Sequence, residues 1–135
     1  MSYLRHIEAC NPPVDEVFLP WRVDGLVVGW VRPRFMQELR RFPAVFAFDD
    51  DRELGLAPGL QGFASRSAAL EEVARKLSAL GVTPAFMNEP YAVTAEGRES
   101  ALCAVDRSAA SHFGVRSFGQ HLNGFVRREG GIYMW

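Results

Sequence analysis

The residues nearest the amino terminus that could bind a metal ion are a histidine and a cysteine. His6 and Cys10 are four positions apart, so they would share one face if this segment is helical. A zinc site needs more protein ligands than these two, so packing of a helix is the favoured interpretation. The run Asp49-Asp50-Asp51 could hold a cation, although a solvated turn explains it better.

A second histidine, His112, could act as an acid or a base, but its position favours a structural role. It falls near the carboxyl end of an expected helix, where the helix dipole stabilises a cation. We therefore expect His112 to cap that helix. Gly114 and Gly119 follow it and are expected in turns, and they do not form a phosphate-binding loop.

Apolar runs and helical periodicity predict the elements that would carry these side chains. Short runs rich in β-branched or aromatic residues predict strands at 26–31, 44–48 and 91–94. Apolar residues at three- and four-residue spacing predict helices at 65–80 and 100–113, and a further helix that begins at Pro33 and ends before Pro43. The opening segment to Pro20 is expected to hold at most a short helix and a turn, and 54–62 a loop.

The segment from Ser65 to Leu80 carries the clearest helical pattern. Apolar residues recur along one face of it, namely Leu70, Val73, Leu77 and Leu80. Ser67 is expected to cap its start, and Gly81 to end it in a left-handed conformation. In the expected helix 100–113 the inward-facing residues would be Leu102, Val105, Ala109 and Phe113.

The carboxyl end of the chain predicts a β-hairpin. His121 to Arg128 is strand-like, Glu129-Gly130-Gly131 suits a turn, and Ile132 begins a return strand that runs to Trp135. A terminal edge of bulky apolar residues invites association with other chains, and natural domains avoid it. Two interpretations therefore stay open: the hairpin completes the sheet of this domain, or the chain is a shortened piece of a longer protein.

The composition is typical of an ordered globular protein. Of the 135 residues, 48% are hydrophobic and 23% are charged, which is enough to bury a core without disulfides. The 15 basic and 16 acidic residues give a net charge of −1, which argues against a nucleic-acid or membrane-surface binder. The two cysteines form no disulfide framework, and neither a signal peptide nor a membrane-spanning run is found, so a soluble, cytoplasmic protein is expected.

Two stretches near the carboxyl end form a recognisable motif, namely Phe113-Gly114-Val115-Arg116 and Gly119-Gln120-His121-Leu122-Asn123-Gly124-Phe125-Val126-Arg127. They resemble the start of the Nudix domain in the thiamine-pyrophosphokinase-related Nudix hydrolases. In that family the segment leads into a hairpin whose second strand passes a tryptophan and continues towards a pair of arginines. Gln120 departs from the family pattern, which has a small or aliphatic residue at that position.

Earlier stretches resemble, in the same order, the accessory domain that precedes the Nudix domain in those proteins. They are His6-Ile7, Cys10-Asn11, Val23-Asp24-Gly25, Val28-Gly29-Trp30-Val31, Arg66 to Gly81, Glu89-Pro90-Tyr91 and Asp106-Arg107-Ser108-Ala109-Ala110. Asp106 stands where the family has a glutamate. The resemblance thus covers essentially the whole chain.

The resemblance implies metal-dependent hydrolysis of a diphosphate by a longer protein. Nudix enzymes carry the motif G-x5-E-x7-R-E-U-x-E-E-x-G-U, where U is bulky and aliphatic, and its glutamates hold Mg²⁺ or Mn²⁺. This chain lacks the motif. Its one partial match ends at Gly81-Val82 and would put Arg75, Ser78 and Ala79 where glutamates must stand, so we expect that helix to be structural. No catalytic residue, metal or cofactor is expected in this chain, and Mg²⁺ or Mn²⁺ is implied for the missing motif.

The implied organisation is an accessory domain over residues 1–115, followed by the first hairpin of a Nudix domain over residues 116–135. The expected fold class is α+β, in which a mixed sheet and two to three helices precede the hairpin. A three-layer α/β arrangement of the accessory domain is the alternative.

In the longer enzyme the first hairpin strand could face the substrate cleft, which makes His121, Asn123 and Arg127 candidate substrate-binding residues. Trp30 of the accessory domain is a further candidate. The polar residues of the strand could instead hydrogen-bond the accessory domain, since polar side chains at an interface must find partners. Trp21 and Phe86 are further aromatic candidates, and the sequence does not choose among them and Trp30.

The favoured function is that of the N-terminal part of a Nudix-type pyrophosphohydrolase. The substrate would be a diphosphate small molecule, either a thiamine diphosphate analogue or a nucleotide-like compound. The chain would shape the substrate cleft or a homodimer, would be inactive by itself, and would have the remainder of the Nudix domain as its partner. The alternative is a stand-alone, non-catalytic binding or oligomerisation module that pairs with another chain through its 121–135 hairpin. A weaker third hypothesis is an acyltransferase-like α/β enzyme, for which the sequence indicates no pocket.

Overall fold

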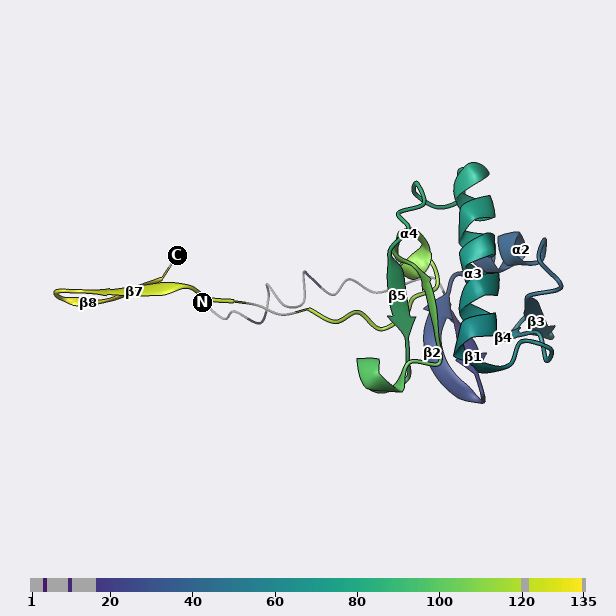
Figure 1. Ribbon diagram of the computed structural model, residues 1–135, viewed down its shortest axis with the longest axis horizontal. Helices are drawn as coiled ribbons and strands as arrows, with labels where there is room; N and C mark the ends of the chain where they lie inside the picture. Colours follow the sequence, from purple (N-terminus) through teal and green to yellow (C-terminus); the bar gives the residue numbers. More distant parts are fainter. Residues whose placement is uncertain (1–3, 5–9, 11–16, 120–121, 135) are drawn as a thin grey trace.

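The protein has an α+β fold in which a body is followed by a separate hairpin. The computed structural model describes residues 4, 10, 17–119 and 122–134. Residues 17–119 form the body, and the hairpin near the carboxyl end is drawn apart from it (Figure 1). The mixed sheet and the helices of the body confirm the expected fold class. Within the described residues, no helix combines the length and the apolar character needed to cross a membrane.

A four-stranded mixed sheet forms one half of the body, with the strands in the order β2-β1-β4-β3. The strands are β1 (Leu19–Val23), β2 (Leu26–Val31), β3 (Phe46–Asp49) and β4 (Glu53–Leu56). β1 and β4 run parallel, while the β1–β2 and β3–β4 pairs are antiparallel. β2 has the predicted bounds, and β3 begins two residues later than predicted.

Two strands of this sheet correct the expectations from the sequence. The opening segment to Pro20 was expected to hold at most a short helix and a turn, yet β1 begins at Leu19 and lies inside the sheet, with Trp21 and Val23 buried in the core. The predicted loop at 54–62 is wrong over β4, where Leu54 is fully buried and the strand pairs with β3. Burial against neighbouring strands outweighs the weak strand propensity of a short, glycine-containing segment.

A two-residue turn joins β1 and β2, and a buried arginine holds it in place. Asp24 and Gly25 have φ angles of 51° and 79°, the left-handed values that a tight hairpin needs at both central positions. The guanidinium of Arg66, 6% exposed, donates to both carboxylate oxygens of Asp24 at 2.9 and 2.6 Å. This pair ties helix α3 (Gly62–Ala79) to the turn, so two of the stretches that resemble the Nudix family meet here.

Helix α3 confirms the strongest helical prediction, with changes at both ends. It begins three residues before Ser65, and Ser67 lies inside it rather than at its cap. The Ser67 hydroxyl donates to Phe63 O at 2.7 Å and accepts from Ala104 N at 2.9 Å. Gly81 ends the helix with a φ of 71°, as predicted, whereas Leu80 is exposed rather than inward-facing. The shorter helix α2 (Pro33–Leu39) begins at the proline, as predicted.

The segment 100–113 is not the helix that its apolar spacing predicts. It follows a short 3₁₀ helix, η1 (Arg98–Ser100), and holds strand β6 (Cys103–Asp106) and the single-turn helix α4 (Arg107–Ala110). β6 pairs antiparallel with β5 (Pro90–Val93), which confirms the strand predicted near Tyr91. Helix α3 packs against β6, and Figure 1 shows it running alongside this strand pair. A strand followed by one helical turn spaces its apolar residues much as a longer helix does, which explains the error.

An aromatic cluster joins the two halves of the core. Phe113 is fully buried, and its ring centroid lies 4.8 Å from that of Trp21, 5.1 Å from Phe35 and 6.0 Å from Phe46. These neighbours come from β1, α2 and β3. Phe113 therefore connects the segment that follows α4 to the four-stranded sheet.

Gly114, which follows Phe113, lies very close to the backbone of β2. Trp30 N donates to Gly114 O at 3.3 Å, and Gly114 has a φ of 57°. A Cβ atom at Gly114 would overlap the backbone of Trp30, and one at Gly29 would overlap Phe113 O. The stretches Val28-Gly29-Trp30-Val31 and Phe113-Gly114-Val115-Arg116 thus contact each other through their glycines, which explains why both carry a glycine there.

The hairpin comprises β7 (Phe125–Arg128) and β8 (Gly131–Met134), which pair antiparallel. The hairpin prediction is confirmed, although Asn123 precedes β7 rather than lying in it, and Gly131 belongs to β8 rather than to the turn. Several of its large apolar side chains are exposed, namely Phe125, Ile132, Tyr133 and Met134.

Candidate functional site

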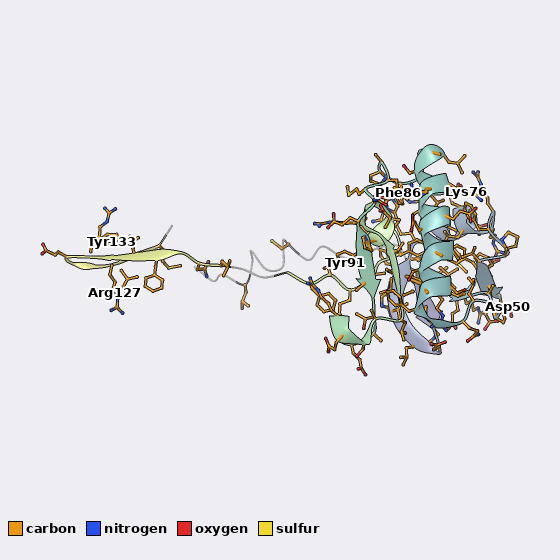
Figure 2. The ribbon with its side chains drawn as sticks, viewed as in Figure 1. Asp50, Lys76, Phe86, Tyr91, Arg127 and Tyr133 are labelled. Carbon is orange, nitrogen blue, oxygen red and sulfur yellow. The ribbon has the colours of Figure 1, made fainter. Side chains whose placement is uncertain are left out.

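The candidate substrate-binding residues lie in two separate places. Trp30 is in β2 of the body and is 51% exposed, whereas Asn123 and Arg127 are exposed residues of the hairpin region. His121 lies outside the described residues. Figure 2 shows Arg127 on the hairpin, apart from the body, with Tyr133 on the opposite side of the ribbon. The structure therefore does not bring Trp30 together with Asn123 or Arg127.

The other two aromatic candidates have structural contacts. Trp21 is fully buried in the core, so it is closed to a ligand. The Phe86 ring is covered by the Arg75 guanidinium, whose Cζ lies 3.9 Å from the ring centroid. Phe86 also lines a cavity of about 320 Å³ together with Glu71, Glu89 and Asp106, whose carboxyl groups make it acidic. Of the three aromatic candidates, Trp30 is the one that combines an exposed ring with a basic surrounding.

Trp30 borders a cavity of about 310 Å³ where β2, the start of α2 and the end of α4 meet. We call it the Trp30 pocket. Its lining residues are Phe18, Trp30, Arg32, Arg34, Phe35, Ser111 and His112. Sequence reasoning missed the two arginines, although both stand within four residues of Trp30 in the run Trp-Val-Arg-Pro-Arg.

Local structure accounts for this gathering of side chains. β2 ends at Val31, and Pro33 starts α2 directly afterwards, so Trp30, Arg32 and Arg34 follow one another across a sharp change of chain direction. The Arg32 guanidinium lies over the Phe18 ring, 5.6 Å from its centroid. The rings of Phe35 and His112 are 5.3 Å apart, which brings the end of α4 against the start of α2.

His112 occupies the inner part of the pocket and differs from the cationic cap that was expected. Helix α4 already ends at Ala110, and the His112 ring contacts Phe35 instead. Partial burial, together with the charges of Arg32 and Arg34, lowers the pKa of His112 below its usual 6.5. The imidazole is therefore neutral at pH 7, with Nδ1 3.4 Å from Ser111 Oγ.

A titration of His112 tests this electrostatic picture. We expect its imidazole pKa below 6.5, and we expect the Arg34→Gln substitution to raise it because one of the two repelling charges is lost. NMR of the imidazole protons across pH 4.5–8.5 measures both values, with His112→Gln to assign the resonance. A wild-type pKa above 6.5, or one that Arg34→Gln leaves unchanged, would rule out the proposed charge effect.

Asp106 is the most strongly hydrogen-bonded carboxylate of the described residues, and its role is structural. It accepts from the backbone N–H groups of Met87, Glu89 and Ser108 at 3.0–3.1 Å, and from the Ser108 hydroxyl. Burial raises the pKa of Asp106, but the hydrogen bond from the Ser108 hydroxyl and those from the backbone outweigh it, so the net pKa is lowered. Because donors surround the carboxylate, it is not available as a general base.

Nothing in the described part of the chain forms a metal centre. No group of three or more His, Cys, Asp or Glu side chains lies close enough to hold an ion there, so the residues present do not fit the Mg²⁺ or Mn²⁺ site of a Nudix enzyme. Asp50 and Asp51 sit in a turn with left-handed φ angles, and Asp51 pairs with Arg40, which agrees with the turn interpretation. His6 lies outside the described residues, so its pairing with Cys10 is untested.

The helix that partly imitates the Nudix motif carries ordinary surface ion pairs. Arg75 contacts Glu71 at 2.7 Å and Lys76 contacts Glu72 at 2.6 Å, both at helical spacing and exposed. The thiol of Cys103 is also poorly reactive, because it is buried and desolvation raises its pKa to about 12. These groups support the fold rather than a reaction.

Comparison with known proteins identifies the family. Residues 2–117 match the family described as a domain of unknown function, DUF4743, and the chain belongs to it. The chain is 29% identical over 144 aligned positions to "Nudix hydrolase 20, chloroplastic" and 28% identical over 137 to "Nudix hydrolase 24, chloroplastic", both of Arabidopsis thaliana. Each alignment covers 99% of this chain and 38% of the relative, in its N-terminal part. The chain thus spans about two fifths of the length of these relatives, which supports a Nudix-associated role.

Proposed function

We propose that this chain is the N-terminal region of a Nudix-type pyrophosphohydrolase and is not catalytic by itself. The observation that carries the proposal is the alignment of nearly the whole chain with the N-terminal part of two Nudix hydrolases more than twice its length. The lack of the Nudix glutamate motif in the sequence supports it. Mg²⁺ or Mn²⁺ would be held by the part of the enzyme that follows this chain.

The proposed division puts the accessory domain at residues 1–115 and the opening hairpin of the Nudix domain at 116–135. The family match to residue 117 supports a boundary in this region. Residues on both sides of position 117 contact earlier parts of the body: Arg116 Nη1 donates to Glu96 O at 2.9 Å, and Phe118 N donates to the Tyr91 hydroxyl at 3.2 Å. These contacts would fix the direction in which the chain leaves the accessory domain.

The exposed side chains of the hairpin support the proposal that further β-structure packs against it. Ile132, Tyr133 and Met134 of β8 are 60%, 52% and 69% exposed, an unusual state for three consecutive bulky apolar residues. We propose that the remainder of the Nudix domain covers them in the longer protein. Asn123 and Arg127 would then border the substrate cleft.

The proposed substrate class is a diphosphate small molecule. The resemblance to the thiamine-pyrophosphokinase-related Nudix hydrolases favours analogues of thiamine diphosphate, and a nucleotide-like diphosphate is the alternative. A cytoplasmic location remains our proposal for this chain, while the names of the two plant relatives place those proteins in chloroplasts. A homodimer through the accessory domain is part of the same proposal.

Hydrolysis assays on two proteins test the proposal. The 135-residue chain and the protein that also includes the following part of the gene are each given thiamine diphosphate or ADP with Mg²⁺. We expect phosphate release from the longer protein and none from the chain. Mg²⁺-dependent release by the purified chain, at a rate that survives repeated purification, would refute the proposed division of labour.

The exposed apolar side chains of the hairpin also favour a second candidate function, a non-catalytic module that pairs with another chain through β7 and β8. An unpaired strand edge is a known recognition surface. Sedimentation of the wild-type chain and of Ile132→Lys separates the candidates. Concentration-dependent association that the substitution abolishes would support the module, and a monomer at all concentrations would exclude self-pairing.

A further inference from the structure

We propose that the Trp30 pocket is a binding site for an aromatic molecule that carries a phosphate or diphosphate group. The site lies within this chain and needs no metal ion. The inference stands independently of the proposed Nudix activity, because the described residues that line the pocket all belong to the body. It rests on the aromatic walls of the pocket, on its charge, and on the state of its histidine.

Aromatic rings form much of the wall. The indole of Trp30 is 51% exposed at the rim, Phe35 lies almost fully buried behind it, and Phe18 is half-buried. Leaving a large ring half in water on a strand forgoes burial that the core could supply, so a ligand that stacks on it gains binding energy. Stacking of a flat ring on an aromatic side chain is a recurring source of affinity in proteins that bind nucleic-acid bases.

Among the described residues, the ionisable side chains that line the pocket are all basic, namely Arg32, Arg34 and His112. Four other cavities of the body each include at least one carboxylate, such as Glu89 in the cavity that also contains Arg98 and Arg107. The described lining of the Trp30 pocket therefore contains basic groups and no carboxylate. A phosphate, which accepts several hydrogen bonds from a planar guanidinium, matches this lining better than a neutral or cationic ligand.

Arg34 is the side chain best suited to hold the phosphate. Other arginines of the body face carboxylates, as Arg22 faces Glu53 at 2.7 Å and Arg107 faces Glu89 at 2.7 Å. Within the described residues, Arg34 has no such ion pair. Its guanidinium can therefore turn to a ligand without first breaking an ion pair with a described carboxylate.

His112 and Ser111 complete the pocket with groups that hydrogen-bond a phosphate. Neutral His112 carries one ring N–H donor, and the Ser111 hydroxyl lies beside its Nδ1 at 3.4 Å. The charged groups that face this histidine are Arg32 and Arg34, from the turn between β2 and α2, while Phe35 packs on its ring. A bound phosphate would offset the charges of both arginines, so binding should raise the imidazole pKa and be accompanied by proton uptake.

Binding of ADP to the 135-residue chain, in EDTA and at low salt, tests the inference. The probes are ADP, adenosine (the ring without the anion) and inorganic pyrophosphate (the anion without the ring). Calorimetry and quenching of tryptophan fluorescence measure the affinities. We expect ADP to bind at least about tenfold more tightly than either partial probe, because stacking and charge-assisted hydrogen bonds act together.

Three variants locate the binding. Arg34→Gln should weaken ADP by at least about tenfold, Arg34→Lys by less because the charge is kept, and Trp30→Leu should remove the fluorescence change and weaken ADP but not pyrophosphate. Arg52→Gln, an exposed arginine outside the pocket, is the matched control and should bind ADP as the wild type does. Thermal melts confirm that each variant is folded.

Some results would overturn the inference. Equal affinities for ADP and pyrophosphate would indicate an unspecific anion effect. Equal losses of ADP affinity in Arg34→Gln and Arg52→Gln would show that the pocket is not the site. The absence of ADP binding at millimolar concentration would also contradict the inference. Because EDTA removes metal ions, the outcome is independent of the hydrolysis assay. Failure of either experiment leaves the other interpretable.

Discussion

Replacing Gly114 with alanine is expected to destabilise the body by about 3 kcal/mol or more, the largest effect we predict for a single methyl group. Gly114 has a φ of 57°, and a Cβ atom there would overlap the backbone of Trp30. Backbone cannot move aside as a flexible side chain does, because Trp30 lies within β2 and donates to Gly114 O. Urea unfolding followed by far-ultraviolet circular dichroism gives the free energy of unfolding.

Gly119 provides the matched control for this substitution. It is a few residues further along the same segment, has no left-handed φ, and a Cβ atom there meets nothing within 4 Å. Gly119→Ala should change the free energy of unfolding by about 0.5 kcal/mol at most. If the two variants were equally stable, the close contact between Gly114 and β2 would not be what holds this end of the body in place.

Replacing Asp106 with asparagine is expected to cost about 2–3 kcal/mol of stability at pH 7. Both carboxylate oxygens accept hydrogen bonds: Oδ1 from Met87 N and Ser108 N, and Oδ2 from Glu89 N. An asparagine turns one of these acceptors into a donor that faces an N–H group, which leaves a buried polar atom unsatisfied. Thermal and urea unfolding of both proteins measure the difference.

The pH dependence of this difference follows from the lowered pKa of Asp106. A carboxyl group with a folded-state pKa below its unfolded value stabilises the fold fully above the unfolded pKa of about 3.9. That contribution is lost as the pH falls through the folded-state pKa. The difference in the free energy of unfolding between the wild type and Asp106→Asn should therefore be constant from pH 5 to 8 and decrease below about pH 4. If this difference instead increased on acidification, the assigned role of the Asp106 carboxylate as a hydrogen-bond acceptor would be contradicted.

Local sequence patterns predicted those elements whose signals are complete within a few residues. The apolar run of β2, the proline that starts α2 and the left-handed Gly81 after α3 each decide a local structure by sterics or burial. β1 and β4 were missed because they are short, contain Pro20 or Gly55, and gain their stability from neighbouring strands. Such tertiary stabilisation leaves little trace in a single sequence.

The candidate site was predictable only in part for a similar reason. Trp30 was identified as a possible ligand contact, but its partner His112 is 82 positions away in the sequence and was assigned to a helix cap. The false helix at 100–113 hid the strand β6, and with it the turn that carries His112 towards α2. Arg32 and Arg34 could have been identified, because the sequence places both of these basic residues close to Trp30.

The family resemblance gained a physical explanation that the sequence alone did not offer. Val23-Asp24-Gly25 meets Arg66 through an ion pair, and the glycine of Val28-Gly29-Trp30-Val31 meets that of Phe113-Gly114-Val115-Arg116. These short stretches are far apart in the chain but contact each other in the body. Their contacts join distant parts of the chain within the body, which is followed by the hairpin.

The central claim is that this accessory domain belongs to a longer Nudix hydrolase, and the most direct test is to sequence the gene beyond the codon for Trp135. The account predicts an open reading frame that continues through a pair of arginines into a complete G-x5-E-x7-R-E-U-x-E-E-x-G-U motif. A stop codon immediately after Trp135 would contradict it, and the hairpin would then have to be explained by pairing with another chain.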